Sequence, residues 1–282
     1  MTRRNFVPAL AGAASLSLAA AQNAKPAHRP GRLKQAVCPG VFGRNMPLEE
    51  RCRHAARLGL HGIDLIGPKD WPTLQKYGLL PTMCPGGGTI PVGFNHVENH
   101  AKFEKPVHEL IDQCAAAGAP NLIGLVGSRA GQPEEKGIEN CVTFCNKIKS
   151  HLEDKNVTFC IEYLNSKVNH PDYDFDHMSY GVEICKRTNS PRVKILYDMY
   201  HVQIMEGDII RTAKQNLQYI GHLHTAGNPG RHEMDDTQEM NYRGIARALV
   251  EMGYNGYISH EYSPTRDPIQ SLEETLKIFD IA

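Results

Sequence analysis

Residues 193–198 read Val-Lys-Ile-Leu-Tyr-Asp, a short apolar run rich in β-branched and aromatic side chains that stops at a carboxylate. This composition predicts a buried strand. The same pattern recurs at residues 158–162, 220–224 and 257–261. Each run ends in a side chain able to bind a metal ion, which indicates that the strands belong to one repeating architecture with its polar groups at one end.

On both sides of these runs, short apolar segments alternate with segments of helical periodicity. We expect strands at 33–37, 62–66, 79–83, 122–125, 158–161, 193–197, 220–223 and 257–259. We expect helices at 47–58, 71–77, 103–117, 133–152, 176–187, 207–217, 242–252 and 268–279. Strands separated by helices pair in parallel through right-handed crossovers, and eight such units close into a barrel. The sequence therefore predicts an α/β fold, a (β/α)8 TIM barrel in a single domain.

An open, doubly wound sheet is the alternative to a closed barrel. Such a sheet would place a glycine-rich dinucleotide-binding turn after its first strand, and no such turn is present there. Residues 86–88 are three glycines after a predicted strand, but they lack the required spacing, and we interpret them as a loop.

The balance of charges limits the partners. The chain of 282 residues has 31 basic and 31 acidic side chains. With no dominant basic patch, nothing points to nucleic acid or to an anionic membrane surface. The charge balance is compatible with a small-molecule partner. The oligomeric state is left open, a homo-oligomer included.

The first 21 residues have the parts of a secretory signal. Arg3 and Arg4 precede the weakly apolar stretch 7–21, which ends in three alanines. The stretch resembles a twin-arginine signal, which exports folded proteins, and it is shorter than the ~20 residues that span a bilayer. We expect a signal at 1–21, a linker at 22–32 and a barrel domain at 33–282. The signal predicts a periplasmic or exported protein without stable membrane insertion. If the stretch is only an N-terminal extension, the protein is cytoplasmic.

An exported protein could pair some of the eight cysteines, but a chain this large does not need a disulfide framework. Several lie within apolar strand or helix patterns, where a free thiol packs as a small hydrophobic group. We therefore favour buried free thiols.

The four strand ends predict a metal site. Glu162, Asp198, His224 and Glu261 follow one another at intervals of 36, 26 and 37 residues, close to the roughly 31 residues of one unit in a barrel of about 250 residues. At the carboxyl ends of successive strands they converge on the face where barrel active sites form. Three carboxylates and one imidazole suit one divalent cation, Mn²⁺ or Mg²⁺, with Co²⁺ as a third candidate.

The motifs around these residues resemble those of the sugar phosphate isomerase/epimerase superfamily of xylose isomerase-like barrels, in particular the hydroxypyruvate isomerase branch. The matching stretches are 161–165, 197–203, 220–224, 229–233, 239–242, 253–254 and 261–264. The resemblance implies a metal-dependent isomerase of the aldose-ketose type that works by proton transfer through an enediolate. It also implies that the partner is a small hydroxy-carbonyl compound, a sugar or a keto acid.

The resemblance also implies roles for individual residues. Glu162 and Glu261 are the expected acid/base pair, and both also touch the metal. His201 and Arg231 are the expected substrate-binding residues. His222 shares a strand face with His224 but lies one step deeper, so we expect it to be a packed core histidine.

Some features leave alternatives open. His224 stands where hydroxypyruvate isomerases often have Gln, whereas ketose 3-epimerases of the superfamily have His, so a ketose 3-epimerase is one alternative. An exported barrel that binds a sugar through its metal without turnover is another. The superfamily also includes three-zinc endonucleases, but a near-neutral chain argues against a DNA-binding surface.

Overall fold

The computed structural model describes residues 29–282. The predicted signal at 1–21 and most of the predicted linker lie outside these residues. The strands are β1 Lys34–Val37, β2 Gly62–Ile63, β3 Cys84–Gly87, β4 Asn121–Gly124, β5 Thr158–Glu162, β6 Val193–Asp198, β7 Ile220–Thr225 and β8 Tyr257–His260. All of them pair in parallel in the order β2-β1-β8-β7-β6-β5-β4-β3.

The ring closes between β2 and the residues that precede β3. Gly62 and Leu80 form a parallel bridge. The backbone N–H groups of Ile63 and Leu65 donate to the carbonyls of Leu80 and Met83 at 3.0 and 2.7 Å. The predicted (β/α)8 barrel is therefore confirmed.

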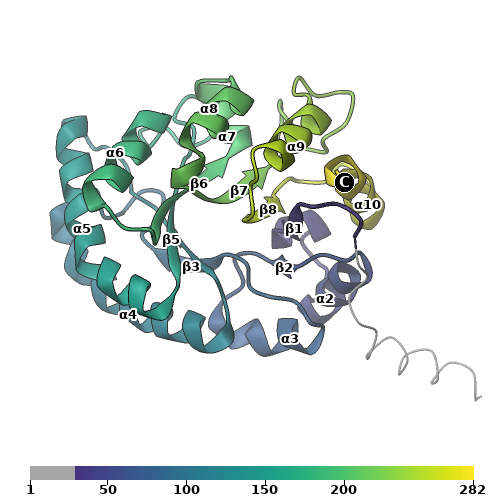
Figure 1. Ribbon diagram of the computed structural model, residues 1–282, viewed down its shortest axis with the longest axis horizontal. Coiled ribbons are helices and arrows are strands. Elements are labelled where there is room, and N and C mark those ends of the chain that lie inside the picture. The colour runs from purple at the N-terminus through teal and green to yellow at the C-terminus, as the bar shows by residue number, and fades with distance from the viewer. Residues whose placement is uncertain (1–28) are drawn as a thin grey trace, which may run out of the picture.

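The helices lie outside the strands (Figure 1). They are α2 Leu48–Arg57, α3 Trp71–Lys76, α4 His100–Ala117, α5 Glu134–Lys155, α6 Met178–Thr188, α7 Met199–Met205, α8 Ile209–Asn216, α9 Tyr242–Glu251 and α10 Pro268–Phe279. Short 3-10 helices span Pro39–Phe42, Pro68–Asp70, Val97–Asn99 and Leu217–Tyr219. The eight predicted helices are all present, and α7 is an additional helix that the periodicity did not indicate.

Local sequence explains where several helices begin and end. Helices α4, α5 and α6 end at Gly118, Asn156 and Asn189, which adopt left-handed backbone angles with φ of 70°, 57° and 49°. Glycine and asparagine are the residues that most readily adopt this conformation. Helix α10 begins after Asp267, whose carboxylate accepts hydrogen bonds from the N–H groups of residues 269 and 270.

The third strand differs from its prediction. The apolar run at 79–83 lies before β3 and forms the closing bridge, and β3 itself contains Gly86 and Gly87. The interpretation of the glycines as a loop was wrong for these two. A Cβ on Gly86 would collide with the carbonyl of Ile123 on β4, so the close approach of the two strands requires glycine.

The interior of the barrel is apolar on one side and polar on the other. Met83, Ile123, Cys160 and Leu196 form a small buried cluster separate from the main core. On the other side, the buried polar residues are Asp64 after β2, His222 and His224 on β7, and Ser259 on β8. The barrel interior therefore offers a polar environment near β2, β7 and β8.

All eight cysteines lie within the described residues, and each is buried and free, as the sequence indicated. Among residues 29–282, no helix combines the length and the apolar character needed to cross a membrane.

Candidate active site

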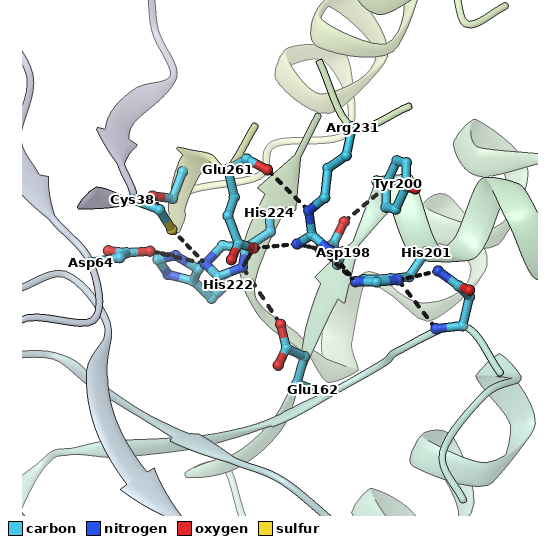
Figure 2. A network of polar contacts seen from close by, with 12 residues as sticks. Cys38, Asp64, Glu162, Asp198, Tyr200, His201, His222, His224, Arg231 and Glu261 are labelled. Atoms are coloured by element: carbon cyan, nitrogen blue, oxygen red, sulfur yellow. Dashed lines mark hydrogen bonds and ion pairs between the residues drawn. The ribbon is translucent and has the colours of Figure 1, made fainter. Parts of the chain in front are cut away.

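The four strand ends singled out in the sequence meet at the carboxyl end of the barrel. Glu162 ends β5, Asp198 ends β6, His224 lies in β7 and Glu261 follows β8. One ligand atom from each residue lies within 4.8 Å of the others, and Figure 2 shows the side chains pointing toward one another. Glu162, Asp198 and His224 are buried, and the Glu261 side chain is 27% exposed. These four residues could hold one cation.

His224 supplies a specific reason to expect a cation. Its Nδ1 atom is buried and has no hydrogen-bond partner among residues 29–282. It lies 2.9 Å from Oε2 of Glu261 and 3.7 Å from Oε1 of Glu162. Buried polar atoms are normally satisfied, so a nitrogen aimed at two carboxylates without a hydrogen bond fits a metal ligand. The oxygen-rich donor set with one imidazole suits Mn²⁺ or Mg²⁺.

The two glutamates have different electrostatic environments. Burial raises the pKa of Glu162, and the nearby Glu261 carboxylate adds to this effect. Burial also acts on Glu261, but Arg231 and His224 outweigh it and hold the pKa of Glu261 well below its usual range. Burial raises the pKa of Asp198 as well. Glu162 is thus the stronger base of the pair, and Glu261 is kept ionised.

Arg231 lies against the open side of this cluster. Its Nη2 donates to Oε2 of Glu261 at 2.7 Å and lies 3.2 Å from Oδ2 of Asp198. Its guanidinium carbon lies 5.0 Å from the centre of the Tyr200 ring. The residue adopts a left-handed backbone conformation with φ of 57°, which is strained for a non-glycine residue. The loop after β7 thus directs a fixed positive charge toward the carboxylates.

His201 lies in the first turn of α7, beside Asp198, and is fully buried. Its Nδ1 accepts a hydrogen bond from the backbone N–H of Asn165 at 3.2 Å. The side-chain amide of Asn165 is oriented because its oxygen accepts from the N–H groups of residues 168 and 169, so its NH₂ also faces Nδ1. Burial, and next Arg231, hold the pKa of His201 well below its usual value. The neutral ring therefore carries its proton on Nε2.

With its proton on Nε2, His201 places an N–H donor opposite an N–H donor of Arg231. Arg231 Nη1 lies 2.8 Å from His201 Nε2, and both groups are N–H donors when His201 is neutral. An oxygen atom that accepts from both would satisfy them. The pair is therefore suited to a substrate carboxylate, carbonyl or hydroxyl group.

Asp198 also positions α7. Its Oδ1 accepts a hydrogen bond from the Tyr200 N–H at 2.9 Å, which caps the helix, while Oδ2 faces Arg231. A short capped helix after β6 was not evident from the sequence. It explains how His201 is held next to a candidate ligand three residues earlier in the chain.

Sequence reasoning missed Asp64. This residue follows β2, is completely buried and contacts both His222 and His224 (Figure 2). The available signal was a carboxylate inside the apolar run 62–66. His222 is a packed core histidine, as predicted, and its ring nitrogen bonds Asp64. Cys38 lies 3.9 Å from His224 Nε2, and burial raises the pKa of its thiol to about 12.

The predicted site residues therefore lie together. The candidate ligands, His201 and Arg231 form one connected network at the carboxyl end of β5 to β8.

Comparisons with known proteins place named isomerases among the relatives of this chain. A stretch of 108 residues is 38% identical to the 2-oxo-tetronate isomerase of Cupriavidus necator, covering 38% of this chain and 41% of that protein. The putative hydroxypyruvate isomerase of Mus musculus is 25% identical over 246 residues, or 80% of this chain and 87% of that protein. The chain spans between 41% and 64% of the length of four curated relatives.

The fold is also found among solved structures. An AP endonuclease of family 2 from Brucella melitensis superposes with a TM-score of 0.77 at 24% identity, covering 85% of this chain and 96% of that one. At this identity the likeness concerns the fold. Residues 52–280 match the family model described as a xylose isomerase-like TIM barrel. The chain belongs to the xylose isomerase-like TIM barrel family.

Proposed function

We propose that this protein is a divalent-metal-dependent isomerase that moves a carbonyl group between adjacent carbons of a small hydroxy-carbonyl compound, in the manner of a hydroxypyruvate isomerase. The observation that supports this most strongly is the convergence of four ligand atoms within 4.8 Å, with two glutamates among them. A site that only bound a sugar would not need two carboxylates in opposite electrostatic environments.

Glu162, Asp198, His224 and Glu261 would hold the cation. Mn²⁺ or Mg²⁺ suits their donor atoms, and Co²⁺ is also compatible. When bound, the cation supplies Lewis-acid stabilisation of the negative charge that develops on the substrate oxygens. It also balances the charge of three buried carboxylates, which Arg231 alone offsets only in part.

The two glutamates divide the proton transfer. Burial makes Glu162 the stronger base, so it suits removal of the proton from the hydroxyl-bearing carbon. Glu261 follows β8, whereas Glu162 ends β5, and Glu261 suits delivery of a proton to the former carbonyl carbon. Because the two groups interact, their titration belongs to the pair.

For hydroxypyruvate the atoms balance without a co-reactant. A proton leaves C3 and another is added to C2, while the hydroxyl proton passes from O3 to O2. The C2 ketone becomes an alcohol and C3 becomes an aldehyde. The relatives named as hydroxypyruvate and 2-oxo-tetronate isomerases favour substrates that carry a carboxylate. Arg231 and the Nε2–H of His201 are the donors that suit this carboxylate or the adjacent oxygen.

A ketose 3-epimerase is the second candidate, and His224 favours it because epimerases of the superfamily place His at this position. Epimerisation returns the proton to the carbon that lost it, on the opposite face. The isomerase and the epimerase would use the same base and the same cation, so identification of the reaction product distinguishes them. A non-catalytic metal-dependent sugar-binding barrel is the third.

The test uses the purified protein loaded with Mn²⁺ or Mg²⁺, which is offered hydroxypyruvate, 2-oxo-tetronate and a panel of ketoses. The isomerase proposal predicts an aldehyde signal in the NMR spectrum of the hydroxypyruvate reaction, which is lost in EDTA and in Glu261→Gln. A 3-epimer formed from a ketose would support the second candidate. Binding without turnover by the wild type would support the third.

Export is a separate part of the proposal and rests on residues 1–21 alone. Expression of the full chain in a bacterium with a twin-arginine system should place the protein in the periplasm. Replacing Arg3 and Arg4 by lysine should retain it in the cytoplasm. An unchanged distribution would contradict the signal.

A further inference from the structure

Below the four candidate ligands lies a fully buried polar group that the proposed chemistry does not use. Oδ2 of Asp64 lies 3.0 Å from Nε2 of His224 and 2.7 Å from Nε2 of His222. Oδ1 of Asp64 accepts a hydrogen bond from the Thr82 hydroxyl. All four residues are 0% exposed, and Figure 2 shows Asp64 on the side of the histidines away from Glu162 and Arg231.

The contact with Asp64 determines which nitrogen of His224 can face the cation. A neutral imidazole has one donor nitrogen and one acceptor nitrogen. With a carboxylate 3.0 Å from Nε2, the proton belongs on Nε2, because the other tautomer would place two lone pairs against each other in a buried site. Nδ1 is then the nitrogen with the free lone pair, and it is the atom that faces Glu162 and Glu261 without a hydrogen bond.

His222 and Asn121 complete the arrangement. Nδ2 of Asn121 donates to the Thr82 carbonyl at 2.9 Å and lies 3.4 Å from Nδ1 of His222. His222 therefore accepts at Nδ1 and donates from Nε2 to Asp64. The carboxylate receives two N–H groups and one O–H group, which allows it to stay ionised inside the barrel. Burial alone raises the pKa of Asp64, but the two histidines outweigh it and lower the pKa.

We propose that Asp64 is a positioning residue for the metal centre: it holds the proton of His224 on Nε2 and so directs Nδ1 to the cation. The inference rests on the metal-dependent function proposed above and adds a residue to its machinery. Hydrogen-bonded carboxylates behind a ligating histidine fix its tautomer and raise its basicity, and their loss typically weakens metal binding 10- to 100-fold.

Two variants of Asp64 distinguish its hydrogen bonds, which orient the histidines, from its negative charge. Asp64→Asn keeps an oxygen that can accept from both histidines and removes the charge. Asp64→Leu removes both. Asp174→Asn is the matched control, because Asp174 is equally buried and accepts hydrogen bonds from Asn95, Arg129 and Tyr180, none of them a candidate ligand.

The first readout is Mn²⁺ affinity, measured from the electron paramagnetic resonance signal of free Mn²⁺. We expect the dissociation constant to rise about 10- to 100-fold in Asp64→Leu, to rise less in Asp64→Asn and to stay unchanged in Asp174→Asn. An Mn²⁺ affinity in both Asp64 variants within twofold of the wild type would overturn the proposal. So would binding of two Mn²⁺ ions to the wild type with loss of one in Asp64→Leu, since Cys38, Asp64 and His224 would then be ligands of a second ion.

The second readout needs no variant of Asp64. Nitrogen-15 NMR of histidine-labelled wild type loaded with Mg²⁺ should show His224, assigned by comparison with His224→Gln, with its proton on Nε2. A proton on Nδ1 would overturn the proposal even if the Asp64 variants fail to fold. If the wild type binds no cation, the proposed function fails, and the same spectrum of the metal-free protein at a pH where the ring is neutral still tests the role of Asp64.

Discussion

Replacement of Arg231 by methionine tests the electrostatics of the site. Arg231 Nη2 lies 2.7 Å from Glu261 and 3.2 Å from Asp198, and the arginine side chain is only 23% exposed. Two opposite charges 4 Å apart attract by about 4 kcal/mol at an effective dielectric constant of 20, and removal of one member of a buried ion pair typically costs 3–5 kcal/mol. Because Arg231 is partly exposed, we expect the metal-free protein to lose about 3 kcal/mol of stability.

The loss of stability in Arg231→Met should depend on whether a metal ion is bound. In a domain of this size, about 3 kcal/mol corresponds to a decrease in Tm of roughly 6–12 °C. A bound cation neutralises the same carboxylates, so saturating Mn²⁺ should recover most of this loss. Scanning calorimetry of wild type and Arg231→Met in EDTA and in Mn²⁺ measures both quantities.

A matched control distinguishes a metal-site effect from loss of any arginine. Arg129 donates to the buried carboxylate of Asp174 at 2.9 Å, outside the candidate site. Arg129→Met should lower the Tm equally in EDTA and in Mn²⁺. The reasoning is refuted if Arg231→Met is as stable as the wild type in EDTA, or if Mn²⁺ restores it no more than it restores Arg129→Met.

Three further predictions concern catalysis, pH and packing. Glu162→Gln should lower turnover about 10²- to 10⁴-fold while Mn²⁺ binding persists, and near-normal turnover would remove Glu162 as the base. The pKa of His177 is raised above its ordinary value of 6.5, first by its hydrogen bond to Asp176. A raised pKa means that the folded protein holds the proton more tightly than the unfolded chain does. The stability difference between wild type and His177→Gln should therefore be complete below pH 6.5 and disappear as the pH rises through the folded pKa. Urea titrations that find no such trend would contradict this assignment. Gly124→Ala places a Cβ against the buried Phe159 ring and should destabilise the protein by about 1–3 kcal/mol in the same titrations, whereas an unchanged midpoint would show that the ring can move.

Much of the barrel could be predicted from the sequence because β5 to β8 are short segments rich in β-branched, aromatic and other apolar residues, with the length typical of buried strands. The position of strand β3 could not be predicted, because it depends on the close approach of Gly86 to the Ile123 carbonyl. Hydrophobic patterns contain no information on how closely two backbones approach. Helix α7 escaped prediction because it spans only seven residues and depends on the cap by Asp198.

The candidate site could likewise be predicted only in part from the sequence. Its four candidate ligands each lie at the end of an apolar run, which is visible in the sequence. The network behind them depends on contacts between distant segments, and Asp64 meets His222 across 158 residues. Nothing near Asp64 in the sequence indicates that partner. The orientation of Arg231 toward Glu261 likewise arises from the loop conformation after β7.

The central claim is that Glu162 and Glu261 transfer protons to and from carbon at a metal centre, and exchange with solvent deuterium tests it most directly. The protein with Mn²⁺ or Mg²⁺ in D₂O would be offered hydroxypyruvate, 2-oxo-tetronate and ketoses, with deuterium at carbon followed by NMR. We predict deuterium at the carbon beside the carbonyl of at least one substrate, dependent on metal and absent in Glu162→Gln and Glu261→Gln. Metal-loaded wild type that binds these compounds and incorporates no deuterium would contradict the account.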